Sequence, residues 1–324
     1  MDLQKIKNQI LDGWNLCIED AYELENAPLN ELLEAANEVR VKFCGNYFNF
    51  CSIINVKSGK CSENCKYCAQ SAHFDTKCET YDILPFEKIM PLAKLNDNAG
   101  VARFSLVASG KGLHKKDDLQ KVIEIYKKLK SHTKFHLCAS FGIVSKEILA
   151  ELKKSGVKTY HHNLETSRKF FPKICTTHTY DDRINTIKSA LCVGLDVCSG
   201  GIFGLGESLK DRIDMAYELK NLKVSSVPIN ILTPIKGTPL ENSAPLCVDE
   251  ILRSIAIFRL ILPHVFLRLA GGRNNLKNSV KTALNGGINS AITGDFLTTC
   301  GDVAQSDKNL VSECGFVYKK SFDV

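Results

Sequence analysis

The sequence lacks any apolar run that approaches the roughly 20 residues needed for a membrane-spanning helix. Its first residues are mixed polar and charged, without the apolar centre of a secretory signal. Low-complexity linkers are missing as well. We therefore expect a cytoplasmic globular protein with no membrane partner.

Concentrated positive charge is also missing. The 324 residues are 44% hydrophobic and 24% charged, with a formal net charge of +6. The pairs Lys115-Lys116 and Lys127-Lys128 fall in helix-like stretches beside acids, as on a solvated helix face, so we expect no nucleic-acid partner. Fourteen cysteines without a secretory signal indicate a reducing compartment, where thiols bind metal or are buried.

One further absence bears on the fold. A doubly wound dinucleotide-binding sheet would carry G-x-G-x-x-G after its first strand, and cysteines stand there instead. From Phe48 onward, short strands alternate with amphipathic helices, which favours βα units and a parallel sheet. About eight units fit a closed α/β barrel of the (β/α)8 TIM type, whose active site lies at the C-terminal ends of the strands.

The elements and domains are predicted by residue range. Strands are expected at 48–55, 102–107, 134–139, 158–163, 196–201, 227–232, 265–269 and 288–293, and helices at 117–130, 145–154, 180–193, 208–221 and 248–262. Residues 1–45 form a helical extension, in which Leu29, Leu32, Leu33 and Ala36 recur at helical spacing. We expect the barrel over residues 46–300 and a C-terminal tail, 301–324, that packs on it.

Three cysteines follow the first predicted strand at C-x3-C-x2-C spacing. They are Cys61, Cys65 and Cys68, with Tyr67 before the last. A structural zinc site takes four ligands, usually from paired C-x2-C segments. A four-iron cluster needs one thiolate per iron, so three cysteines leave one iron open to a cofactor or substrate. The spacing resembles the motif of the radical S-adenosylmethionine (SAM) enzymes, with an iron–sulfur electron carrier or a zinc-stabilised binding protein as the alternatives from another class.

Polar residues occupy strand positions that would face the barrel axis. Successive strand residues point to opposite faces, and Phe135, Leu137 and Ala139 form the apolar set of their strand. An ordinary barrel core is filled by branched apolar side chains. The inward set here is Asn49, Cys51, Arg103, Ser105, His136, Cys138, Ser140, Thr159, His161, Asn163, Glu165, Asp196, Cys198, Asn230 and Arg268. Because unpartnered buried polar groups are unfavourable, we expect a ligand or cofactor in this space.

The inward cysteines are candidate metal ligands. We predict that role for Cys138 and Cys198, while Cys51 could equally be a small buried hydrophobe. The remaining cysteines have no such placement and are expected to be structural: Cys17, Cys44, Cys78, Cys175, Cys192, Cys247, Cys300 and Cys314.

A glycine-rich stretch runs from a predicted strand toward a helix. Gly200, Ile202, Gly204 and Glu207 form the pattern G-x-I-x-G-x-x-E. Glycine lets a backbone approach a ligand closely, although a tight turn would use the same residues. The pattern resembles the adenine-side segment of radical SAM barrels.

Together, these segments resemble the biotin synthase family of radical SAM enzymes. The matching segments are 61–70, 160–167, 175–180, 197–207, 227–230, 236–240, 268–273 and 297–299. The resemblance implies a sulfurtransferase that inserts sulfur into dethiobiotin to form biotin. A second radical SAM group, which includes the hydrogenase maturase HydE and methylornithine synthase, shares the barrel and the three cysteines. It matches the later segments less well and is the alternative.

The resemblance also implies roles for individual residues. Cys61, Cys65 and Cys68 would hold a [4Fe-4S] cluster that binds SAM, and Cys138, Cys198 and Arg268 would ligate an auxiliary [2Fe-2S] cluster that donates sulfur. The radical forms on SAM, so no side chain is implied as catalytic. Implied contacts to SAM are Tyr67, Asn163, Glu165, Arg183, Gly200, Ile202, Gly204, Glu207 and Asn230; implied contacts to substrate are His161, Asn163 and Asn230. Implied partners are flavodoxin or ferredoxin as electron donor and a second copy in a homodimer.

Two positions depart from the family pattern. Ser105 stands where a third auxiliary cysteine is usual, and His161 replaces a substrate-contacting asparagine. Ser105 could bind iron through its oxygen, but iron prefers thiolate, and Cys51 could substitute for the missing cysteine. A shifted ligand set could hold a four-iron cluster with an extra sulfide.

Overall fold

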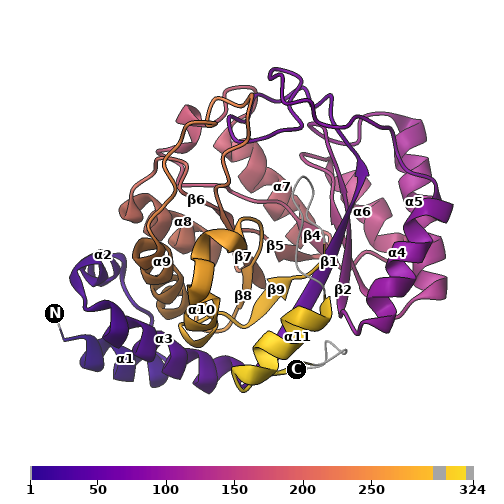
Figure 1. The fold of residues 1–324 in the computed structure, drawn as a ribbon. Coiled ribbons are helices and arrows are strands. Elements are labelled where there is room, and N and C mark those ends of the chain that lie inside the picture. The colour runs from indigo at the N-terminus through magenta and orange to yellow at the C-terminus, as the bar shows by residue number, and fades with distance from the viewer. Residues whose placement is uncertain (1, 295–303, 319–324) are drawn as a thin grey trace.

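A computed structural model describes residues 2–294 and 304–318. Parallel strands close into a barrel with helices outside it (Figure 1). The strands follow one another in chain order around the barrel, and β9 returns to pair with β1. The predicted (β/α)8 barrel is therefore confirmed. Residues 297–299 and Cys300 lie outside the described residues, and the domain boundaries at residues 45 and 300 stay predictions.

Apart from β1, which has 11 residues, the strands of the barrel are short, as predicted. They are β1 (Tyr47–Lys57), β2 (Arg103–Ala108), β3 (His136–Ser140), β4 (Thr159–His161), β5 (Asp196–Cys198), β7 (Ser226–Ile231), β8 (Phe266–Leu269) and β9 (Ser290–Ile292). Two further strands add to it: β6 (Gly201–Phe203) pairs with β7, and β10 (Val317–Tyr318) pairs with β1.

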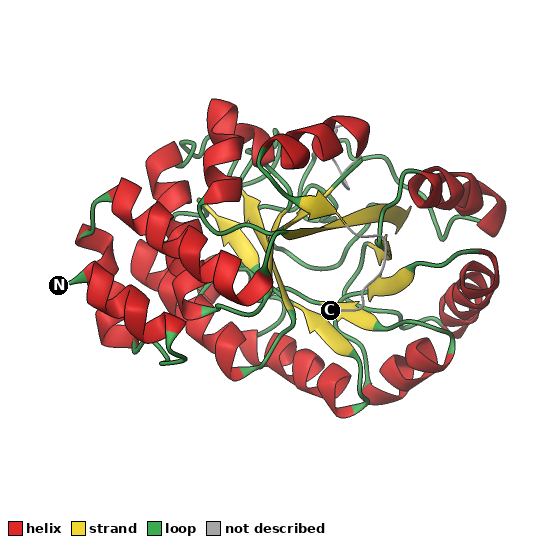
Figure 2. Ribbon diagram, turned by 90° about the horizontal axis from the view of Figure 1, so that it is seen from below, coloured by secondary structure: helices red, strands yellow, loops and turns green. Residues whose placement is uncertain are grey.

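Helices cover the outside of the barrel (Figure 2). They are α1 (Leu3–Leu11), α2 (Ile18–Glu23), α3 (Leu29–Cys44), α4 (Phe86–Asn98), α5 (Lys116–His132), α6 (Lys146–Lys154), α7 (Tyr180–Cys192), α8 (Leu209–Asn221), α9 (Val248–Ile261), α10 (Val280–Asn285) and α11 (Ala304–Glu313). The helix α4 was not among those predicted, since Pro91 in its interior weakens the helical signal.

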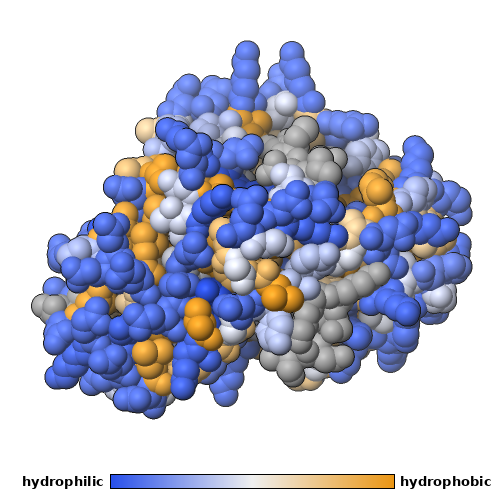
Figure 3. All heavy atoms as spheres, turned by 60° about the horizontal axis from the view of Figure 1, so that its bottom comes forward, coloured by the Kyte–Doolittle hydropathy of each residue, from blue (hydrophilic) through white to orange (hydrophobic). Residues whose placement is uncertain are grey.

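The N-terminal helices pack on one side of the barrel. The helix α3 buries Leu32, Leu33 and Ala36 and lies against α9, while α2 lies against α8. Charged and polar side chains cover most of the face in Figure 3, with apolar residues in small groups between them. Within the described residues, every helix is too short or too polar to span a bilayer.

One predicted strand is interrupted. Residues 196–201 were expected to be continuous, but β5 ends at Cys198 and β6 begins at Gly201. The break occurs because the N–H of Gly200 donates to the side chain Oδ1 of Asn163 (3.1 Å) rather than to a neighbouring strand. The glycine-rich stretch is thereby held beside the end of β4.

Capping boxes fix the start of the two helices nearest this stretch. Thr179 and Asp182 cap α7, and Ser208 and Asp211 cap α8, each pair exchanging side-chain and backbone hydrogen bonds. Arg183 follows one turn into α7, so its position relative to the strand ends is set by this cap.

Candidate active site

The three-cysteine segment lies on the loop that follows β1. The loop folds back on itself because the N–H of Cys61 donates to the Gln70 carbonyl (2.9 Å) and the N–H of Ala72 donates to the Cys61 carbonyl (2.7 Å). Burial raises the pKa of Cys61 and raises that of Cys68 to about 11. The thiols therefore keep their protons until a metal displaces them.

The spacing of these thiols fits a cluster better than a single ion. Among the described residues, the sulfurs of Cys61, Cys65 and Cys68 are not mutually within 4.8 Å, as ligands of one ion would be. The three thiols are still near enough to interact through charge, because Cys61 raises the pKa of Cys68 and Cys68 raises the pKa of Cys65. Each iron of a cluster takes its own thiolate, so three separated thiols on one loop fit a [4Fe-4S] cluster.

The cysteine loop is clamped to the segment that precedes α7. The side chain Oδ1 of Asn64 accepts hydrogen bonds from the N–H groups of Thr176 (2.9 Å) and Thr177 (3.3 Å). The carboxylate of Glu63 accepts from Thr177 Oγ1 (2.8 Å) and from His178 Nδ1 (2.5 Å). Glu63 and His178 are both buried, so these bonds fix the loop against the barrel.

His178 connects this clamp to Arg183. The Nε–H of Arg183 donates to His178 Nε2 (3.1 Å), which leaves the imidazole hydrogen on Nδ1 to bond Glu63. Arg183 also donates through Nη1 to the Asn163 carbonyl (2.8 Å) and faces Glu165 Oε1 at 3.5 Å. A continuous chain of polar contacts thus runs from the cysteine loop to the end of β4.

We expect His178→Ala to weaken SAM binding about tenfold, because a buried hydrogen-bonded link worth about 1–2 kcal/mol is removed. Isothermal titration of the reconstituted protein with SAM measures the effect. His178→Asn, which can still donate and accept, should recover part of the affinity. His73→Ala is the control, since this exposed ring lies on the same loop, where its Nε2 meets the Ser62 carbonyl and the ring lies near Phe74. Equal SAM affinities for His178→Ala and His73→Ala would refute the link.

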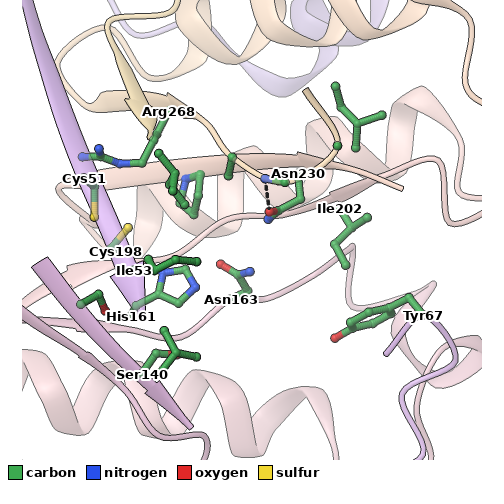
Figure 4. Close-up of a pocket in the computed structure, with 18 of the residues that line it drawn as sticks. Cys51, Ile53, Tyr67, Ser140, His161, Asn163, Cys198, Ile202, Asn230 and Arg268 are labelled. Carbon is green, nitrogen blue, oxygen red and sulfur yellow. Dashed lines mark hydrogen bonds between the residues drawn. The ribbon is translucent and has the colours of Figure 1, made fainter. Parts of the chain in front are cut away.

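The glycine-rich stretch passes between two asparagines. Asn163 Oδ1 accepts from the N–H of Gly200 (3.1 Å), and Asn230 Nδ2 donates to the carbonyl of Gly201 (3.1 Å). Asn230 Oδ1 also accepts from the N–H of Gly271 (2.9 Å; Figure 4). Beside them, Glu165 adopts a positive φ of 71°, a strained conformation for a residue with a side chain. The site is therefore held in place by backbone contacts as well as side chains.

We expect Gly201→Ala to destabilise the fold by about 1–3 kcal/mol, since the added methyl has no room. Its Cβ would lie 2.5 Å from the Glu165 carbonyl oxygen and 2.5 Å from Met215 Sδ. Thermal unfolding followed by circular dichroism measures the change. An unchanged melting temperature would show that the stretch can move away from β4.

Glu207 points into the protein rather than into the cavity. Its Oε1 accepts from the Gly204 N–H (2.9 Å) and from Arg212 Nε (2.6 Å), and its side chain is 1% exposed. The expected contact between Glu207 and SAM remains a prediction. What the structure shows is that Glu207 fixes the turn at Gly204.

A cavity of about 290 Å³ occupies the barrel axis. Predicted site residues that line it are Cys51, Tyr67, Cys68, Ser105, Cys138, His161, Asn163, Cys198, Ile202, Asn230 and Arg268. Predicted site residues that do not line it are Cys61, Cys65, Glu165, Arg183, Gly200, Gly204 and Glu207. Apolar residues such as Ile53 and Val107 contribute to the walls, so the interior is less uniformly polar than expected.

We call the inner part of this cavity the deep wall, defined by Cys51, Arg103, Cys138, Cys198 and Arg268. Cys51 lies in the middle of β1, well before the cysteine loop at the end of that strand. Figure 4 shows the sulfurs of Cys51 and Cys198 turned toward one another, with the Arg268 guanidinium beside them. Among the described residues, no aspartate or glutamate lines the cavity. Thiols and guanidinium groups without carboxylates fit a negatively charged, sulfur-ligated cluster.

The charge environment of the deep wall differs between its cysteines. Burial raises the pKa of Cys51 and raises that of Cys138 to about 12. Burial acts in the same direction on Cys198, but hydrogen bonding to His161 and the charge of Arg268 outweigh it and lower the pKa to about 6. Cys198 is therefore the thiol of the deep wall most ready to bind metal near neutral pH.

Sequence reasoning missed Cys175. It was expected to be structural, but its Sγ lies 3.6 Å from the Sγ of Cys65 and 3.3 Å from His178 Nδ1. Hydrogen bonds from Cys65 and His178 outweigh burial and lower the pKa of Cys175. Its neighbour in the motif, His178, was also not assigned a role. The one available signal was that both lie in the segment 175–180, which matched the family.

Comparison with known proteins gives consistent matches. The model of the Radical SAM superfamily matches residues 55–219, and the model of the Biotin and Thiamin Synthesis associated domain matches residues 228–317. The chain is 99% identical over 324 residues to the biotin synthase of Campylobacter hominis, covering 100% of both chains. It is 54% identical over 320 residues to the biotin synthase of Fusobacterium nucleatum, covering 96% of this chain and 89% of the relative.

Solved structures agree in fold. Methylornithine synthase superimposes with a TM-score of 0.84 at 20% identity, covering 96% of each chain. The [FeFe]-hydrogenase maturase HydG superimposes with a TM-score of 0.82 at 16% identity, covering 98% of this chain and 75% of that one. These two likenesses show the barrel fold alone, whereas the sequence matches extend over the whole chain. The chain belongs to the biotin synthase family of radical SAM enzymes.

Proposed function

We propose that this protein converts dethiobiotin to biotin by radical insertion of sulfur. One observation carries the proposal: a single cavity joins the cysteine loop at its mouth to a second set of cysteines in its deep wall. When bound, SAM and a [4Fe-4S] cluster supply the radical that takes hydrogen from the substrate, and the auxiliary cluster supplies sulfur. Family membership and the arrangement of cysteines both support this reading.

At the mouth, Cys61, Cys65 and Cys68 would hold the [4Fe-4S] cluster. Arg183 would bind the SAM carboxylate, since its planar guanidinium suits bidentate contact with a carboxylate. Glu165 would contact the ribose. The residues expected to surround the rest of SAM are Tyr67, Asn163, Gly200, Ile202, Gly204, Glu207 and Asn230, of which Gly204 and Glu207 act through the turn that they form.

In the deep wall, Cys138, Cys198 and Arg268 would ligate the auxiliary cluster, with Cys51 in the place of Ser105. Both Cys51 and Ser105 line the cavity, but the sulfur of Cys51 is turned toward Cys198. Thiolate is also the usual ligand of iron–sulfur clusters in proteins. The cluster would be a [2Fe-2S] form or a four-iron form with an extra sulfide.

Between mouth and deep wall, His161, Asn163 and Asn230 would contact the substrate. Each asparagine amide uses one N–H within the protein, Asn163 toward Glu165 (3.3 Å) and Asn230 toward Gly201 (3.1 Å). An amide has two N–H groups, so each asparagine keeps one to donate to a ligand. These donors suit the carbonyl of the ring in dethiobiotin.

The remaining partners follow from the family. An electron must come from a redox protein such as flavodoxin or ferredoxin, and a homodimer in the cytoplasm is the expected form.

Anaerobic reconstitution with iron and sulfide, followed by incubation with SAM, reductant and dethiobiotin, tests the function. Mass spectrometry should detect biotin together with 5′-deoxyadenosine. Deoxyadenosine without biotin would support the radical chemistry but indicate that the substrate is not dethiobiotin. The absence of both biotin and 5′-deoxyadenosine would overturn the proposal.

A further inference from the structure

Cys175 places a fourth thiol against the loop that holds the cysteine triad. The Sγ atoms of Cys175 and Cys65 lie 3.6 Å apart, and this is the one sulfur–sulfur hydrogen bond among the described residues. Both residues are buried, Cys65 at 8% exposure and Cys175 at 3%. The triad alone accounts for the ligands of a [4Fe-4S] cluster, so the mechanism leaves Cys175 without a use.

Hydrogen bonds already hold together the two backbone segments that carry Cys65 and Cys175. The N–H of Lys66 donates to the carbonyl of Ile174 (3.0 Å), and the N–H of Asn64 donates to Thr177 Oγ1 (3.1 Å). These bonds lie on either side of the sulfur pair. The sulfurs of a disulfide are about 2.05 Å apart, so side-chain rotation over about 1.5 Å would join them without breaking the clamp.

We propose that Cys65 and Cys175 form a reversible disulfide when the cluster is absent and peroxide is present. The site would be a protective modification site, and it rests on the proposed function in so far as Cys65 otherwise binds iron. The disulfide takes one cluster ligand out of use and keeps both sulfurs from irreversible oxidation. It also holds the empty cysteine loop in its folded position, ready for a new cluster.

The chemistry balances with hydrogen peroxide as the oxidant. One thiol is oxidised to a sulfenic acid while peroxide is reduced to water. The second thiol attacks that sulfur, the S–S bond forms, and a second water leaves. The sum is two thiols and one peroxide giving one disulfide and two waters. A small thiol reductant returns two electrons and two protons and restores both cysteines.

Neighbouring groups favour this pair over pairs within the triad. His178 Nδ1 lies 3.3 Å from Cys175 Sγ, and Thr177 Oγ1 lies 3.5 Å from it, so the sulfur is held facing Cys65. Cys61 and Cys68 have no comparable sulfur contact to Cys65 within the part of the chain that the structure describes. Pairing inside the triad would require the loop to refold.

Peptide mapping tests the proposal directly. The full-length protein is stripped of iron anaerobically, treated with hydrogen peroxide, alkylated and digested. We expect the dominant cross-linked peptide to join Cys65 to Cys175, and dithiothreitol to remove it. Cross-links confined to Cys61, Cys65 and Cys68, with Cys175 recovered in its alkylated form, would overturn the inference.

A matched pair of variants tests the protective role. After peroxide, dithiothreitol and reconstitution, the iron regained in the [4Fe-4S] cluster of the cysteine loop should be at least about threefold lower in Cys175→Ser than in the wild type, with sulfinic or sulfonic acid at Cys65. Cys192→Ser, an exposed cysteine on α7, should behave like the wild type. Equal iron recovery in both variants would refute the protective role. Neither readout depends on biotin formation, so a failed disulfide and a failed biotin assay are distinguishable.

Discussion

Cys51→Ala should leave the SAM-binding cluster in place and abolish biotin formation. After reconstitution, its iron content should fall to about four atoms per chain, those of the remaining [4Fe-4S] cluster. Biotin should decrease by at least about 100-fold. Removing a direct ligand should cost at least as much as the largest losses found for residues that only support a metal ligand. Deoxyadenosine formation should persist, because the cysteine loop and Arg183 are untouched. Iron analysis and product mass spectrometry of the same preparation measure both effects.

Variants at Ser105 provide the matched control. Ser105→Ala should keep the auxiliary iron if Cys51 is the ligand. In the double variant Cys51→Ala with Ser105→Cys, a thiol returns to the cavity wall at the position usual for the family, and auxiliary iron should recover. Full auxiliary iron in Cys51→Ala alone, or its loss in Ser105→Ala, would assign the ligand to Ser105 and contradict our proposal.

Arg183→Met should raise the dissociation constant of SAM by about 150-fold to 4,000-fold. This buried arginine contacts His178, the Asn163 carbonyl and Glu165, and removing one member of a buried charged network costs about 3–5 kcal/mol. The proposed contact of Arg183 with the SAM carboxylate would also be lost. Equilibrium binding to reconstituted protein with verified iron content measures the affinity.

Arg168→Met is the control for this prediction. Arg168 is exposed and pairs with Asp181 at 2.7 Å on the surface, where such a pair contributes about 0–1 kcal/mol. Its SAM affinity should stay close to that of the wild type. If both variants bind SAM equally well, Arg183 is not a SAM ligand, and the polar chain from the cysteine loop has only a structural role.

The alternation of strand residues between the inward and the outward face supplied much of the site prediction. In β3, alternation placed Cys138 and Ser140 inward, and both line the cavity. The rule works because a paired strand has a fixed period of two. The prediction of one continuous strand over residues 196–201 was wrong, because the strand breaks between β5 and β6, where the N–H of Gly200 bonds to the side chain of Asn163. Such a competing side-chain bond leaves no periodic trace in the sequence.

Contacts between distant segments could not be predicted in the same way. Cys65 and Cys175 are separated by 110 positions, and their contact depends on the path of the loop before α7. Glu207 illustrates a related limit. Its place in the glycine pattern was clear from the sequence, but the direction of its side chain is set by Arg212 on the next helix. A motif thus identifies a residue before it shows which way that residue points.

The deep wall imposes an order on how the protein can be loaded. Cys51, Arg103 and Arg268 are buried at the inner end of the same cavity that Tyr67 and Cys68 line at its mouth. With the proposed assignment of the clusters, iron and sulfide for the inner cluster would have to travel past the places proposed for SAM and substrate. We expect the inner cluster to be installed first and the mouth to fill last. Sulfur that the inner cluster loses in one reaction could then be replaced only after the products have left. The protein could therefore not rebuild this cluster and turn over substrate at the same time.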